Sequence, residues 1–232
     1  MLIRTLSVWL VGLPVTIFIF VIVIISLAFD RSGNSIHSIG ALWSRILLFL
    51  SGVTVEIKGA ENLFQDSPQI LASNHRGAFD ILALQGFIPI QFRWVAKKSL
   101  FKIPIIGWSM SLAGYVSIDR EKAGSAYKSI ERAAEKVKKG ASVLIFPEGT
   151  RSSAGSLLPF KRGGFLLAIK SGVPIVPVSI RGTENLMKKE SILIRPGAVK
   201  VVIGKPIPVS GADEKLLMEM VKKAIEEGLT AC

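Results

Sequence analysis

The sequence predicts an α/β fold, in which helices flank a largely parallel or mixed sheet and an N-terminal membrane-embedded helical hairpin precedes it. Three observations support this prediction. Residues 5–29 contain no charge, short β-branched segments alternate with helical patterns after residue 52, and residues 143–146 are continuously apolar. An apolar strand without polar alternation is typical of a parallel sheet that helices cover on both faces.

The composition is both apolar and basic. The 232 residues include 29 Lys and Arg against 17 Asp and Glu, a net charge of +12, and half of the residues are hydrophobic. This apolar content excludes a disordered chain. The single cysteine, Cys232, excludes a disulfide scaffold, and the same count with two histidines excludes a zinc finger. The mixture predicts contact with a bilayer and with an anionic partner.

The N-terminal region carries the most apolar segment. As a helix, residues 5–29 would reach about 37 Å, which exceeds the roughly 30 Å hydrocarbon core of a bilayer. A polar turn at residues 30–34 and a second apolar stretch at 36–53 follow. We interpret the two stretches as helices that insert together, with both ends on the cytoplasmic side. A single spanning helix followed by an ordinary packing helix is the alternative.

Two further features refine this region. The apolar run is too long for a cleaved signal peptide, and no small-residue cleavage site follows it. Pro14 predicts a kink in the first helix, because proline lacks the N–H that a helix interior uses. Residues 1–52 carry a net charge of +2, so residues 53–232 carry +10. We therefore expect a membrane-anchoring hairpin at 1–52 and a basic α/β domain at 53–232, on the cytoplasmic side.

Seven strands and several helices are expected in the second part. A helix at 125–139 has Ile130, Ala133, Ala134 and Val137 on one face and Gly140 at its end, and a last helix covers 212–227. The predicted strands are 53–58, 69–73, 92–96, 115–118, 142–146, 175–180 and 199–203. In such sheets the chemistry lies beyond the carboxyl ends of the strands, so functional residues are expected there.

The strand at 69–73 is followed by NHRGAFD, residues 74–80. On a regular helix the five residues from His75 to Asp80 would turn through about 500°, so the two side chains would point apart. A bend at Arg76 and Gly77 would let Asp80 accept a hydrogen bond from Nδ1 of His75 and leave Nε2 as a general base. The alternative is a histidine that caps the helix and an aspartate that interacts with its dipole.

Basic residues gather at the ends of other predicted strands. Glu148 and Arg151 follow the strand at 142–146, and their proximity predicts an ion pair, with a simple loop salt bridge as the alternative. Arg120 follows the strand at 115–118, and Lys161 precedes a further helix. Each alone is typical of a solvated cation, but together at sheet ends they predict an anion site, since guanidinium groups bind phosphate in a bidentate manner.

Four motifs, NHRGAFD, GYVSIDR, FPEGTRS and VPIVPV, follow one another in the order and spacing of the glycerolipid acyltransferase family, over residues 53–210. The best-known bacterial member of that family converts lysophosphatidic acid to phosphatidic acid. The resemblance implies transfer of a fatty acyl group from acyl-CoA or acyl-ACP to the free hydroxyl of lysophosphatidic acid. It implies neither a bound cofactor nor a metal, because a thioester is already activated.

The resemblance also implies roles for individual residues. His75 is expected to be the general base and Asp80 the residue that orients it. The acceptor phosphate is expected to bind at Arg120, Glu148, Gly149, Thr150, Arg151 and Lys161. Lys97 and Pro174 fall in candidate regions for the acyl donor or the oxyanion. Neither the single thiol nor any G-x-S-x-G pattern offers a nucleophile, so direct transfer without an acyl-enzyme is expected.

Rival functions remain at this stage. Another lysolipid could be the acceptor within the same family, and a non-catalytic, membrane-tethered protein that binds anionic lipid is a rival of another class. The joint presence of His75, Asp80, Glu148 and Arg151 argues against the second. No nucleic acid partner is expected, because aromatic and basic residues are not interleaved. The expected location is the inner or cytoplasmic membrane, with the catalytic domain facing the cytoplasm.

Overall fold

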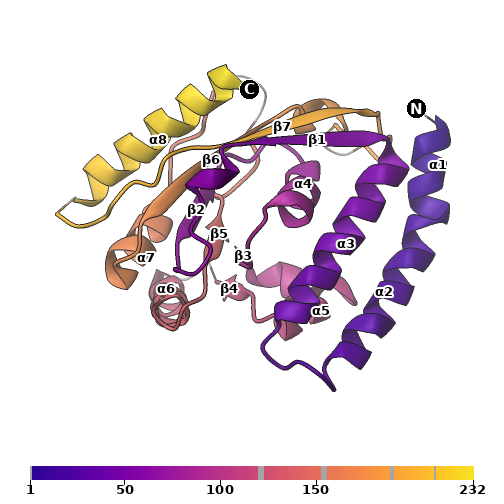
Figure 1. Cartoon of the computed structure of the whole chain (residues 1–232), viewed down its shortest axis with the longest axis horizontal. Coiled ribbons are helices and arrows are strands. Elements are labelled where there is room, and N and C mark those ends of the chain that lie inside the picture. Colours follow the sequence, from indigo (N-terminus) through magenta and orange to yellow (C-terminus); the bar gives the residue numbers. More distant parts are fainter. Residues whose placement is uncertain (1, 120–122, 153–155, 189–190, 212) are drawn as a thin grey trace.

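A mixed sheet of seven strands forms the centre of the protein (Figure 1). The computed structural model describes every residue except 1, 120–122, 153–155, 189–190 and 212. The strand order is β1-β7-β6-β2-β5-β3-β4; β6 and β7 are antiparallel, and the other neighbours are parallel. The strands are β1 (Val53–Lys58), β2 (Ile70–Ser73), β3 (Arg93–Lys97), β4 (Val116–Ile118), β5 (Val143–Ile145), β6 (Ile175–Arg181) and β7 (Gly197–Ile203).

The predicted α/β fold and its mixed sheet are confirmed. Each predicted strand is present, with bounds that differ from the expected ones by at most two residues. The central strands β2 and β5 are completely buried, as their apolar sequences predict. The antiparallel pairing of β7 with β6 is the part of the topology that local sequence patterns do not encode.

Helices cover both faces of the sheet (Figure 1). On one face α6 (Ala123–Lys138), α7 (Gly163–Ser171) and α8 (Glu214–Ala231) bury a cluster that includes Val137, Phe165 and Val221. On the other face α3 (Asn34–Ser51) and α4 (Phe79–Phe87) bury a cluster that includes Leu48 and Leu84. Short elements complete the fold: η1 (Ala60–Asn62), η2 (Lys98–Lys102), α5 (Ile106–Leu112) and η3 (Thr183–Asn185).

The two helices predicted in detail are present. After α6 the chain turns at Gly140, whose φ of 100° is readily adopted only by glycine. The last helix begins later than expected, because the side chain of Asp213 accepts a hydrogen bond from the backbone N–H of Leu216 and caps it. It continues to Ala231, beyond the predicted end at residue 227.

The N-terminal region forms α1 (Leu2–Leu10) and α2 (Gly12–Ser26), which lie outside α3 (Figure 1). The helix is interrupted at Val11, where the carbonyl of Leu10 faces Pro14, four residues on, which has no N–H to donate. Within the described part of the chain, one helix, Leu2–Ser26, is long and apolar enough to cross a membrane.

The second predicted helix of the hairpin, α3, packs against the domain. Leu48 is buried in the cluster that α4 and the sheet share, and Arg45 donates from Nε to the carbonyl of Gly86 at 2.6 Å. The predicted boundary between residues 1–52 and 53–232 therefore does not separate two independently packed units, because α3 shares the core of the α/β domain. The assignment of residues 1–52 to a membrane anchor stays a prediction.

Candidate active site

The parallel strands β2 and β5 are neighbours, and the loops after their carboxyl ends meet. Ala72 of β2 is paired with Ile145 of β5, so the chain that continues from each strand emerges at the same edge of the sheet. His75 follows β2, and Glu148 follows β5. The expectation that functional residues gather at this edge agrees with their positions.

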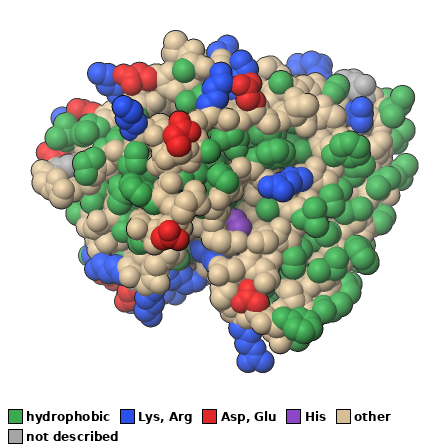
Figure 2. Space-filling model, viewed as in Figure 1, with side chains coloured by type: hydrophobic (Ala, Val, Ile, Leu, Met, Phe, Trp, Pro, Cys, Tyr) green, Lys and Arg blue, Asp and Glu red, His purple; other side chains and the backbone are tan. Residues whose placement is uncertain are grey.

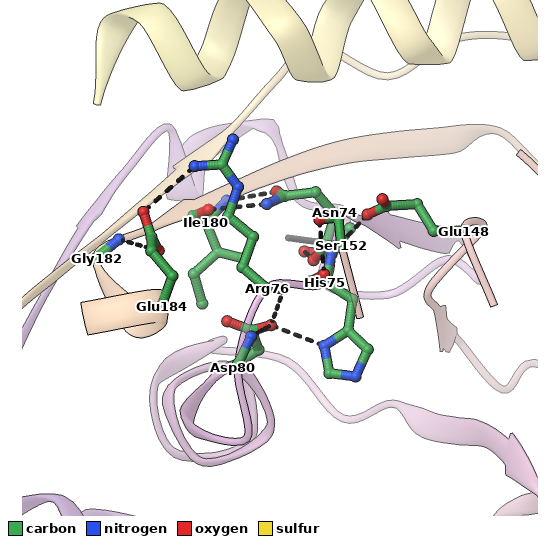
Figure 3. Close-up of polar contacts among 11 residues, drawn as sticks. Asn74, His75, Arg76, Asp80, Glu148, Ser152, Ile180, Gly182 and Glu184 are labelled. Carbon is green, nitrogen blue, oxygen red and sulfur yellow. Dashed lines mark hydrogen bonds and ion pairs between the residues drawn. The ribbon is translucent and has the colours of Figure 1, made fainter. Parts of the chain in front are cut away.

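The imidazole of His75 and the carboxylate of Asp80 form a direct pair (Figure 3). Nδ1 lies 2.7 Å from Oδ2, the Asp80 side chain is fully buried, and the His75 side chain is 13% exposed. A carboxylate accepts hydrogen bonds, so Nδ1 carries the proton. Nε2 is then left with its lone pair, as a general base requires.

The loop between the two residues supplies the bend that their spacing demands. Asp80 is the second residue of α4, and its Oδ2 also accepts from the backbone N–H groups of Arg76 and Gly77 at 2.6 and 2.9 Å. Gly77 packs closely against the loop after β6: a Cβ built on Gly77 would lie 2.9 Å from the carbonyl oxygen of Thr183. A side chain at this position would force one of the two loops to shift.

Glu148 is buried and faces the backbone of the site rather than an arginine. Its Oε1 accepts from the N–H of His75 at 2.9 Å, and its Oε2 accepts from the N–H of Leu158 at 2.8 Å. Among the described residues Glu148 makes no ion pair with Arg151, so the predicted pair is wrong. The backbone amides replace the guanidinium, because Glu148 points inward beneath the loop whereas Arg151 is exposed.

Two further residues hold the loop of His75 and were not singled out from the sequence. The N–H and hydroxyl of Ser152 both donate to the carbonyl of His75, at 2.8 and 3.1 Å. Asn74 binds the backbone of Ile180 in β6 on both sides, accepting from its N–H at 2.8 Å and donating to its carbonyl at 2.9 Å. Asn74 thereby extends the pairing of β2 with β6 up to the residue that precedes His75 (Figure 3).

An ion pair closes the other side of this loop. Nη1 of Arg76 lies 3.3 Å from Oε1 of Glu184, and Oε2 of Glu184 accepts from the N–H of Gly182. Both charged side chains are largely buried. The pair joins the loop after β2 to the loop after β6 (Figure 3), and no local pattern in the sequence predicts a contact across this distance along the chain.

The expected phosphate ligands are only partly brought together. Gly149 adopts a φ of 73° in the turn after β5, and the N–H of Lys161 donates to the carbonyl of Pro147 at 2.7 Å, so the start of the α7 region lies against that turn. Thr150, Arg151 and Lys161 are exposed at this edge. Arg120 lies outside the described residues.

The two candidates for the acyl donor or the oxyanion lie at opposite edges. Lys97 ends β3, at the same edge as His75, and is exposed. Pro174 precedes β6, and its carbonyl accepts from the N–H of Ile70 at the start of β2. Pro174 therefore lies at the amino edge of the sheet, and the structure does not bring it to the site.

A family model described as Acyltransferase matches residues 54–181. The chain belongs to this acyltransferase family. The resemblance seen in the sequence motifs is thereby confirmed, and the match covers the strands β1 to β6 and both loops of the His75–Asp80 site.

Similar proteins have consistent names. The chloroplastic 1-acyl-sn-glycerol-3-phosphate acyltransferase BAT2 of Brassica napus is 41% identical over 206 residues, 88% of this chain and 59% of the relative. The 1-acyl-sn-glycerol-3-phosphate acyltransferase of Pseudomonas aeruginosa is 32% identical over 187 residues, 78% of this chain and 72% of the relative. The chain spans between half and two thirds of the length of the first plant relatives that it matches.

A solved structure has the same fold over almost the whole length of this chain. It is the crystal structure of the 1-acyl-sn-glycerophosphate (LPA) acyltransferase PlsC from Thermotoga maritima. The TM-score is 0.86 at 28% sequence identity, and the match covers 99% of this chain and 95% of that chain. The arrangement of helices and strands described above is therefore the arrangement of a known acyltransferase structure.

Proposed function

We propose that this protein transfers a fatty acyl group from an acyl thioester to the free hydroxyl of lysophosphatidic acid and so makes phosphatidic acid. The observation that carries the proposal is the 2.7 Å pair between His75 and Asp80 at the carboxyl edge of an acyltransferase sheet. The names of the relatives support the choice of acceptor. The acyl donor is acyl-CoA or acyl-ACP.

Acyl transfer to a hydroxyl needs a general base, and His75 can act as one in the tautomer that has its proton on Nδ1 and a free lone pair on Nε2. Nε2 of His75 removes the proton of the acceptor hydroxyl while the oxygen attacks the thioester carbonyl. Asp80 stabilises the imidazolium that forms. When the tetrahedral intermediate collapses, the new C–O bond remains, the C–S bond breaks, and the leaving thiolate takes the proton from His75. The thioester is reactive enough that we invoke no metal or bound cofactor.

Glu148 is assigned a positioning role within this mechanism. Its carboxylate accepts hydrogen bonds from the backbone N–H groups of His75 and Leu158, and these bonds fix the backbone position of the general base. A buried carboxylate would repel an acceptor phosphate, so we place the phosphate on the exposed cations instead. Arg151 and Lys161 at this edge are the described candidates, and Arg120 is the third that the motifs imply.

We further propose that the protein attaches to a membrane through the outer face of α1 and α2, with the domain on the cytoplasmic side. Hydrophobic side chains line this edge of the molecule (Figure 2), and Ile3, Leu10 and Phe18 are 78%, 71% and 65% exposed. This is far more apolar surface than a water-facing helix carries.

The helices are held along the domain at both ends. At one end the hydroxyl of Thr5 accepts from the N–H of Ile194, and in the turn after α2 the carbonyl of Ser32 accepts from Nη2 of Arg93 at 3.4 Å. Trp108 of α5 continues the apolar face, since its ring lies 5.9 Å from that of Phe20. This arrangement favours a helix pair that lies against the bilayer together with the domain.

The membrane proposal is tested by vesicle flotation of the full-length protein. Phe18→Asp with Ile25→Asp should abolish flotation, whereas Ile169→Asp, an equally polar change at an exposed position of α7, should not. Equal flotation of both variants would overturn the proposal. Labelling of a tag at Ser32 from the periplasmic side would instead favour a single span.

The catalytic proposal is tested with a purified full-length chain, a labelled acyl thioester and a panel of lysolipids. Wild type should acylate lysophosphatidic acid, and His75→Ala should lose activity with an unchanged melting temperature. Lys223→Ala, at an exposed position of α8, should retain activity. Preference for a lysolipid without a terminal phosphate would show that the acceptor is a lysolipid other than lysophosphatidic acid. Near-normal turnover by His75→Ala would refute the role of the base.

A further inference from the structure

The imidazole of His75 stacks face to face on the phenyl ring of Phe146. The ring centroids are 4.0 Å apart, and the ring planes differ by 11°. Phe146 comes directly after β5, and His75 comes two residues after β2, so the contact arises where the two paired strands end. Asp80 therefore holds the imidazole in its plane, and Phe146 supports it from one face.

A second aromatic ring contacts Phe146. Trp94 in β3 is buried, and its ring centroid lies 5.5 Å from that of Phe146. Its indole N–H donates to Oε1 of Gln85 at 2.6 Å, which sets the orientation of the indole. Phe146 thus contacts both the imidazole of His75 and an indole ring that a buried hydrogen bond holds in place.

Gln85 is itself fixed by partners on other elements. Its Oε1 also accepts from the hydroxyl of Tyr115 at 3.1 Å, and its Nε2 donates to the carbonyl of His37 in α3 at 3.0 Å. The hydrogen bonds that hold Trp94, the neighbour of Phe146, therefore extend through Gln85 of α4 to His37 of α3. A network in which each polar atom is satisfied holds its members more rigidly than isolated contacts do.

The stack has a consequence for catalysis. When His75 accepts the hydroxyl proton, it becomes a cation whose face lies against the electron-rich face of Phe146. Such a contact strengthens as positive charge develops, and it is worth more in a buried site than in water. An interaction that is stronger in the transition state than in the ground state raises the rate.

We propose that Phe146 is a positioning residue that holds the imidazole of His75 against Asp80 and stabilises the imidazolium formed during acyl transfer. This inference rests on the proposed function, since it assumes that His75 accepts a proton in the reaction. It assigns the first residue of the FPEGTRS segment to the base and not to the acceptor phosphate.

The test compares two phenylalanines in the full-length protein. Phe146→Leu keeps an apolar side chain but removes the aromatic face. Phe165→Leu makes the same change at a fully buried phenylalanine in the cluster on the other face of the sheet. Phe146→Leu should lower kcat about 10-fold, with KM for lysophosphatidic acid changed less than about twofold. Phe165→Leu should lower the melting temperature without this selective loss of kcat.

A second measurement needs no substrate. The chain has two histidines, so the imidazole C–H signals of His75 can be assigned in NMR spectra by comparison with His75→Ala. Because the imidazole stacks on the ring of Phe146, the ring current of that face shifts these signals upfield, so in Phe146→Leu they should move downfield. Phe165→Leu should leave these signals in place.

Fluorination separates the electronic effect from packing. Fluorinated phenylalanines at position 146 keep nearly the same shape while they withdraw electron density from the ring face, so kcat should fall as fluorine is added. A kcat that fluorination leaves unchanged would overturn the proposal, as would equal losses of kcat in the leucine variants at positions 146 and 165. A wild-type protein inactive on every lysolipid would refute the proposed function but leave the NMR result standing.

Discussion

Asp80 controls His75 by two routes that share one oxygen atom. Oδ2 of Asp80 accepts from Nδ1 of the imidazole at 2.7 Å, and it also accepts from the backbone N–H groups of Arg76 and Gly77, which shape the loop that carries the histidine. Three donors on one buried oxygen require its negative charge. The same carboxylate therefore selects the tautomer and holds the base at its place.

Substitution of Asp80 by Asn should show how strongly turnover depends on the negative charge of this carboxylate. The amide keeps one acceptor but loses the charge, and we expect kcat to fall by roughly three to four orders of magnitude, as when the orienting carboxylate of a Ser-His-Asp triad becomes an amide. The matched control is Asp213→Asn at the N-cap of α8, where Asn caps as well as Asp. A similar kcat for both variants in steady-state assays would contradict the role of Asp80.

Glu148→Gln should affect turnover more than acceptor binding. Glutamine offers one acceptor oxygen for the two N–H groups of His75 and Leu158, so one of them must move. A lost hydrogen bond to a charged group costs about 1.5–3 kcal/mol, which corresponds to roughly a 10- to 100-fold loss of kcat. KM for lysophosphatidic acid should change little, whereas Arg151→Ala should show the reverse pattern. A raised KM with normal kcat in Glu148→Gln would place Glu148 in the phosphate site.

Gly77→Ala should disturb the site through packing. The added methyl group would lie 2.9 Å from the carbonyl oxygen and 3.1 Å from the carbonyl carbon of Thr183, so the loop of His75 must shift. We expect a loss of activity of about 10-fold or more, since small displacements of a catalytic group are costly. Gly124→Ala in α6 is the control, because a Cβ there meets nothing within 4 Å. Equal activities of the two variants would show that the loop can adapt.

A buried histidine predicts how stability depends on pH. Burial, with a smaller effect from the charge of Arg93, lowers the pKa of His37 to about 3. The folded state then excludes a proton that the unfolded chain binds below pH 6.5. This contribution to stability is complete above pH 6.5, and below it about 1.4 kcal/mol is lost per pH unit until the folded pKa is reached.

His37→Asn should flatten this dependence, because asparagine does not titrate. Melting temperatures measured between pH 7.5 and pH 5 should fall less in the variant than in wild type. The other titrating groups are common to both proteins, so the difference between the two slopes isolates His37. Parallel slopes would mean that His37 does not set the acid sensitivity.

Local patterns predicted the elements, and contacts between distant segments account for what was missed. The seven strands follow from β-branched runs, whereas the His75–Asp80 pair could be predicted only on the condition that the chain bends at Arg76 and Gly77. The binding of Asn74 to Ile180 joins positions 106 residues apart, which no local pattern records. For Glu148 the nearest cation in the sequence suggested the wrong partner, because backbone amides carry no sequence signal.

The N-terminal helices show a second limit of sequence patterns. The stretch at 36–53 is apolar whether its partner is lipid or protein, and hydropathy does not distinguish the two. In the structure Leu48 of α3 packs into the domain, whereas Phe18 of α2 is exposed. The separation of these faces depends on tertiary contacts such as that between Arg45 and Gly86.

Two serine hydroxyls that the structure describes beside His75 are already engaged in hydrogen bonds, which favours direct transfer to the acceptor. The hydroxyl of Ser152 donates to the carbonyl of His75, and that of Ser73 donates to the carbonyl of Asn74, both at 3.1 Å. Burial raises the pKa of the Cys232 thiol, which disfavours the reactive thiolate. None of these groups is prepared to form an acyl-enzyme.

Kinetics should therefore show a ternary complex. Double-reciprocal plots at several acceptor concentrations should intersect, because the donor and the acceptor must be bound together before the thioester is attacked, whereas an acyl-enzyme would give parallel lines. Cys232→Ala should leave kcat and both KM values unchanged. Mass spectrometry of the protein incubated with acyl thioester alone should find no added acyl mass. A stable adduct that forms without acceptor and disappears when lysophosphatidic acid is added would establish the covalent route instead.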